Sequence, residues 1–112
     1  MGMITLLKHF TFAAGNGGAF ISDWVRVPEG NQNWQLVVLV HGRISTTAAT
    51  LQLQATWDTG VASNVGSSVN LATLGLNNQD ITSAMGPMAR VSLAATADTA
   101  VTISVFLTPK VQ

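Results

Sequence analysis

Apolar side chains recur at every second position along most of this chain. The clearest case is residues 49–58, where Leu51 and Leu53 alternate with Gln52 and Gln54. A period of two places alternate side chains on opposite faces of a β-strand, whereas an amphipathic helix needs a period of 3.6. The pattern returns in further short segments bounded by turn residues, namely 3–12, 19–27, 34–44, 69–74, 90–95 and 101–107.

This spacing of strands constrains the fold class. About eight short strands separated by turns are typical of a β-sandwich or jelly roll rather than of a parallel sheet connected by helices. We therefore predict an all-β fold, an antiparallel β-sandwich or jelly roll with at most one short helical turn. The length allows one core and no second domain, so residues 1–112 are predicted to form a single β-sandwich domain.

The segments between strands give more local expectations. Residues 15–18 favour a tight turn, so residues 19–27 are expected to return alongside or near the first strand. Residues 63–68 are small and polar and are predicted to form a loop. Residues 77–80 carry side chains that cap helices, which predicts one helical turn directly after them. Residues 90–107 are predicted to form a two-stranded meander.

Charge is scarce in this sequence. Of 112 residues, five are acidic and five basic, and the net charge is zero. A net charge near zero favours association over solubility, so we expect some faces to be covered by other copies of the chain or by a host surface. The balanced charge provides no basic stripe, and no nucleic-acid partner is expected.

Cysteine is absent from the sequence, which excludes disulfides, thiolate metal sites and cysteine nucleophiles. The segment from Met1 to Lys8 lacks a basic region and its apolar run is short, so no secretion signal is expected. No apolar stretch approaches the roughly 18 residues that a membrane-spanning helix needs. No membrane partner is therefore predicted.

One tripeptide has a chemical precedent. Asp58, Thr59 and Gly60 form the Asp-Thr-Gly triplet found in retroviral-type aspartic proteases, which dimerise to bring two carboxylates together. However, Trp57 stands where those enzymes carry a small aliphatic residue, too little chain follows, and no later apolar-apolar-Gly segment supports the site. A strand end closed by a turn is the favoured interpretation of Asp58, and no catalytic residue is predicted.

Candidate metal ligands are also few. His9 and His41 are the two imidazoles of the chain, whereas zinc sites use three or four ligands. Both fall opposite the apolar faces of their predicted strands, which favours surface or interface roles. Asn77, Asn78 and Asp80 offer a single carboxylate, a poor cage for calcium. We predict no metal site, no cofactor and no cofactor-binding residue.

The tryptophans bear on carbohydrate binding. Trp34 and Trp57 fall at inward positions of their strands, which favours core packing, while the placement of Trp24 is evenly balanced. Exposure of Trp24 or Trp34 beside the Gln and Asn side chains of residues 32–35 would instead indicate a carbohydrate-binding site.

Four segments carry a resemblance to a known class of proteins. They read SDWVRVPEG, WQLVVLVHG, ATLQLQATWDTG and RVSLAATADTAVTISVFLTP, and the resemblance spans approximately residues 20–108. In this order they resemble the small β-sandwich proteins that tailed bacteriophages use on their particles. The resemblance implies a head decoration (cement) protein or a related accessory structural protein of the virion, without enzymatic activity.

Such a protein would form homo-oligomers and bind the major capsid protein or another virion protein at the particle surface, after synthesis in the host cytoplasm. The alternative hypothesis is a carbohydrate-binding β-sandwich module of a phage tail or of a bacterial surface protein, with carbohydrate as the partner. From their exposed or apolar placement, the candidate interface residues are Met3, Ile4, Thr5, Leu6, Leu7, Val37, Leu39 and Phe106.

Overall fold

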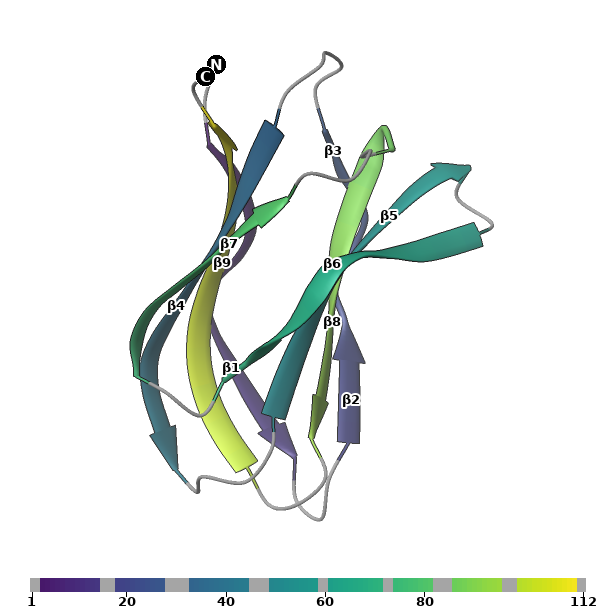
Figure 1. Cartoon of the computed structure of the whole chain (residues 1–112). Helices are drawn as coiled ribbons and strands as arrows, with labels where there is room; N and C mark the ends of the chain where they lie inside the picture. Colours follow the sequence, from purple (N-terminus) through teal and green to yellow (C-terminus); the bar gives the residue numbers. More distant parts are fainter. Residues whose placement is uncertain are drawn as a thin grey trace.

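The described part of the chain consists of β-strands arranged in two antiparallel sheets (Figure 1). The computed structural model describes residues 3–14, 18–27, 33–44, 49–58, 61–71, 74–81, 86–95 and 99–110. No helix occurs in these ranges, and so none that is long and apolar enough to cross a membrane. The strands are β1 (Ile4–Ala14), β2 (Gly18–Ile21), β3 (Val25–Arg26), β4 (Asn33–Ile44), β5 (Ala49–Asp58), β6 (Val61–Asn70), β7 (Gly75–Ile81), β8 (Met88–Ala95) and β9 (Thr99–Lys110).

The order of the strands defines the fold. Sheet A has the order β1-β9-β4-β7, and sheet B has the order β2-β8-β5-β6, with β3 also pairing with β8. Because β2 and β3 both pair with β8, they behave as one interrupted strand. The first strand then pairs with the last, the second with the last but one, and so inward to β5 and β6. This nested pairing is a jelly roll, which confirms the predicted fold class.

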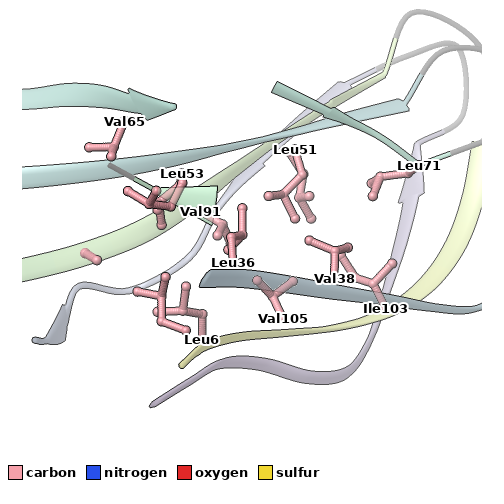
Figure 2. Close-up of a cluster of buried hydrophobic side chains, with 14 of the residues drawn as sticks. Leu6, Leu36, Val38, Leu51, Leu53, Val65, Leu71, Val91, Ile103 and Val105 are labelled. Carbon is pink, nitrogen blue, oxygen red and sulfur yellow. The ribbon is translucent and has the colours of Figure 1, made fainter. Parts of the chain in front are cut away.

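The core lies between the two sheets. Strand β4 shows the alternation that builds it, because Trp34, Leu36, Val38 and Val40 point inward and are at most 3% exposed. The facing side chains of sheet B, including Leu51, close the other side (Figure 2). The prediction that Trp34 packs in the core is therefore confirmed.

Strand β1 keeps its alternation through two compensating irregularities. Its register against β9 gains one residue between Thr5 and Leu7 and another between Leu7 and Phe10. Two single-residue shifts restore the original face, because side chains alternate with a period of two. Leu6 lies at the first of these shifts and is part of the core at 7% exposure (Figure 2), so this candidate interface residue offers no side chain to a partner.

Several local predictions are wrong. Residues 63–68, predicted as a loop, lie inside β6, and residues 77–80, predicted to cap a helix, lie inside β7. The predicted helical turn at 82–85 falls outside the described residues. β6 and β7 are edge strands of mostly polar residues with little apolar alternation, so no β pattern could be recognised at these positions.

Two pairs of strands that are neighbours in the chain lie in opposite sheets. β2 belongs to sheet B, near β1 rather than hydrogen-bonded to it, and Phe20 stacks on Phe10 with ring centroids 4.4 Å apart. β8 and β9 likewise lie in different sheets, so the predicted meander over residues 90–107 is wrong. In a jelly roll the short connections carry the chain from one sheet to the other.

Candidate interaction surface

Sheet A turns one face to the core and the other to solvent, and apolar side chains gather on the outward face. Cross-strand pairing places Val37 of β4 opposite Phe106 of β9, and Leu39 of β4 opposite Leu76 of β7. Leu76 is 61% exposed, and the other three side chains are half-buried. We call these four residues the outer patch.

Uncharged polar residues border the outer patch. Thr5 lies opposite Phe106 on β1, and Asn78 lies opposite Val37 on β7. The charged side chains that the structure describes on sheet A are Lys8 and Asp80, which lie on its two edge strands, β1 and β7. Gln35 Nε2 donates to Asp80 Oδ1 at 3.4 Å. A contact made here desolvates hydroxyls and amides rather than charges, which lowers the free-energy cost of burial.

The outer patch brings together three of the candidate interface residues predicted from the sequence: Val37, Leu39 and Phe106. At the N-terminal end of β1, Met3 is 57% exposed, whereas Ile4 and Leu7 are half-buried and pack against the core. Leu76 was not predicted from the sequence. No alternation around it could have revealed it, because the inward positions of β7 include two amides and a glycine.

Two histidines lie beside the outer patch and share one serine. The rings of His9 and His41 stack in parallel, and His41 Nε2 hydrogen-bonds to Ser104 Oγ at 2.8 Å. The backbone N–H of His9 donates to the same oxygen at 3.0 Å. Ser104 is 2% exposed beneath the rings, so these bonds link three strands and leave the hydroxyl shielded from solvent.

The backbone around both histidines is irregular. His9 has a φ of 45°, which non-glycine residues rarely adopt, and the register of β1 against β9 shifts between Leu7 and Phe10. The register of β4 against β9 shifts between Val40 and Gly42, across His41. The described residues contain no group of three or more His, Cys, Asp or Glu side chains that could hold a metal ion.

A second exposed apolar pair lies on the β5–β6 hairpin. Trp57 is 71% exposed and Val61 is 69% exposed, so the prediction that Trp57 packs in the core is wrong. The register of β5 against β6 gains one residue between Ala55 and Asp58, which buries Thr56 and turns Trp57 outward. The Asp58 side chain and residues 59–60, which carried the protease comparison, lie outside the described part of the structure.

The outward face of sheet B carries a row of linked polar side chains that ends at Trp24. The guanidinium carbon of Arg90 lies 4.2 Å from the ring centroid of Trp24. Arg90 Nε donates to Gln54 Oε1 at 2.9 Å, and Gln54 Nε2 donates to Asn64 Oδ1 at 3.2 Å. Trp24 is half-buried and Trp34 is fully buried, so Trp34 offers no platform for carbohydrate.

Comparison with known proteins identifies no relative of this chain. The chain matches no protein-family model, no curated protein and no solved structure at a significant level. The functional interpretation consequently rests on the fold and on the chemistry of these surfaces.

Proposed function

We propose that this chain is a non-enzymatic structural protein of a virus particle, a decoration or cement protein. It forms homo-oligomers and binds the particle surface by protein–protein contacts centred on the outer patch. The observation that carries the proposal is the outward face of sheet A, where Val37, Leu39, Leu76 and Phe106 lie together and the described charges lie only on the two edge strands. The jelly-roll fold supports it, because viral capsid domains recurrently use this architecture.

The size of the molecule suits a contact of this kind. A standard protein interface buries about 800 Å² on each partner. The molecule measures 40 × 30 × 20 Å, so one broad face of the sandwich provides that area. Full burial of a leucine side chain contributes about 1.5–3 kcal/mol, and Leu76 still has most of that contribution to gain from a partner.

Sedimentation of the purified protein tests self-association. We expect oligomers for the wild type, and Leu76→Glu is expected to shift the protein to monomers because it places a charge in the contact. Ile21→Glu is the matched control, since Ile21 is 51% exposed on sheet B and lies outside the outer patch. A wild-type protein that stays monomeric at every concentration would contradict the oligomer.

A heat challenge tests the role on the particle. Particles of the encoding virus that lack this protein are heated with the wild-type protein, with Leu76→Glu or with Ile21→Glu, and release of the genome is followed. The wild type and Ile21→Glu are expected to raise the release temperature, whereas Leu76→Glu is not. Particles that gain no resistance from the wild-type protein would rule out a cement role.

A further inference from the structure

The polar row on sheet B holds a guanidinium group in a fixed position. Trp24 packs against Arg90 at 4.2 Å, and the Nε–H of Arg90 is engaged by Gln54 at 2.9 Å. Arginine side chains otherwise have considerable rotamer freedom, and a ligand that orders one pays that entropy. Here two contacts have already ordered the side chain before any ligand arrives.

In the described part of the chain, neither Nη nitrogen of Arg90 has a hydrogen-bond partner, and no carboxylate forms an ion pair with it. A planar guanidinium presents two parallel N–H groups that match the two oxygens of a carboxylate. The geometry therefore suits a carboxylate that comes from another molecule.

The surroundings of Arg90 indicate the rest of the ligand. Gln54 and Asn64 continue the row, and Thr50 lies on the same outward face, so the part of this face on β5 and β6 presents amides and hydroxyls. Ile21 and Met88 lie on the same face at β2 and β8. Centres of protein interfaces are enriched in aromatic residues and methionine rather than in such polar side chains. A ligand rich in hydroxyl groups therefore fits the β5–β6 part of this face better than an acidic protein does.

We propose that the outward face of sheet B binds an acidic glycan, an oligosaccharide bearing carboxylate groups. The carboxylate pairs with the Nη groups of Arg90, and sugar hydroxyls hydrogen-bond to the side-chain amides of Gln54 and Asn64. This site lies on the sheet opposite the outer patch, so its occupation is independent of the assembly role proposed above.

Titration with short oligogalacturonates tests the proposal, with neutral malto-oligosaccharides of equal length as the comparison. We expect saturable binding of the acidic probe, with chemical-shift changes at Arg90 Nε–H and at the side-chain amides of Gln54 and Asn64. Arg90→Lys is expected to weaken binding by about tenfold, because an ammonium group cannot make the paired bonds.

Arg26→Gln is the matched control. Arg26 is exposed on β3 opposite Met88, and its substitution removes the same charge from the same sheet without disturbing the row. It is expected to leave the affinity within about threefold, since exposed charges are screened by salt. Leu76→Glu, on the other sheet, is expected to leave glycan binding unchanged.

Three outcomes would overturn the proposal. Equal weakening by Arg26→Gln and Arg90→Gln would mean that only net charge matters. Tighter binding of a polyglutamate peptide than of oligogalacturonate would assign the face to an acidic protein. A wild-type protein with no chemical-shift change on addition of the acidic probe would show that the face binds no such glycan.

Discussion

His9 and His41 stack with ring centroids 4.1 Å apart and 12° between the ring planes, although their strands β1 and β4 are not neighbours. β9 separates the two strands and supplies Ser104, which bonds to both residues. The stack therefore closes over the middle strand of three and shields the hydroxyl below it from water.

Substitution of Ser104 tests this arrangement. Ser104→Ala removes the acceptor of the His9 N–H and the partner of His41 Nε2, and it is expected to lower the free energy of unfolding by about 1–3 kcal/mol. Urea denaturation of wild type and variant measures the difference. A variant as stable as the wild type would show that the hydroxyl contributes nothing.

Substitution of His41 separates the ring contact from the hydrogen bond. His41→Phe keeps a flat ring against His9 but loses the bond to Ser104, so a loss of about 0.5–1.5 kcal/mol is expected. His41→Ala loses both and is expected to be less stable than His41→Phe. Equal stabilities of the two variants would indicate that the stacked ring has no effect.

Tryptophan fluorescence tests whether the side chain of Trp57 points to solvent. Trp34 is 2% exposed and Trp57 is 71% exposed, so Trp57 is expected to supply most of the emission that iodide quenches. Trp57→Phe is expected to shift the emission maximum to the blue, to remove most of the quenching and to change stability by less than about 0.5 kcal/mol. Trp34→Phe serves as the control, and a blue shift in that variant instead would contradict the structure.

The same substitution is expected to destabilise the protein at one glycine and to be tolerated at another. A Cβ at Gly86 would lie 2.6 Å from the carbonyl carbon of Thr56, and backbone cannot move aside as a side chain can. Gly86→Ala is therefore expected to cost about 1–3 kcal/mol, as overpacking does. Gly42→Ala meets no atom within 4 Å and is expected to be nearly neutral in the same urea measurement.

Gln52 holds an irregular part of β6 in place. Between Leu51 and Leu53 the pairing partner on β6 moves from Val69 to Val65, and Gln52 Nε2 donates to the carbonyls of Val65 at 3.1 Å and Gly66 at 3.3 Å. Gln52→Ala is expected to speed amide hydrogen exchange in residues 65–68, because the local structure opens more readily. Gln35→Ala, which loses one long exposed bond, is the control and is expected to leave that exchange unchanged.

The fold class could be predicted from the sequence because the alternation of apolar residues identifies inward positions without knowledge of which strands pair. Leu36, Val38, Leu51 and Leu53 are apolar whichever strand lies beside them, and all four are fully buried. The alternation also placed Val37, Leu39 and Phe106 on outward faces, where the outer patch is found. Their proximity to one another followed only from the tertiary register.

The errors arise where a strand gains a residue or lacks apolar side chains. One extra residue between Ala55 and Asp58 reversed the side to which Trp57 points, and no property of the residues in this interval indicates that shift. β6 and β7 form strands because they pair with β5 and β4, although their own composition does not favour a strand. The row from Trp24 to Asn64 draws on residues far apart in the chain, so sequence spacing did not reveal it.

The nested strand order also determines when each part of the molecule can form. Among the described strands, β5 and β6 are the one pair that is consecutive in the chain, whereas Ile4 pairs with Leu107. During synthesis β5 can pair with β6 as soon as β6 has been made. β1 has no partner strand until β9 has left the ribosome. Folding dominated by such distant pairings is slow, and unpaired strand edges attract other chains in the meantime. β9 completes sheet A because it lies between β1 and β4, and it supplies Phe106, so a nascent chain without β9 has an incomplete outer patch.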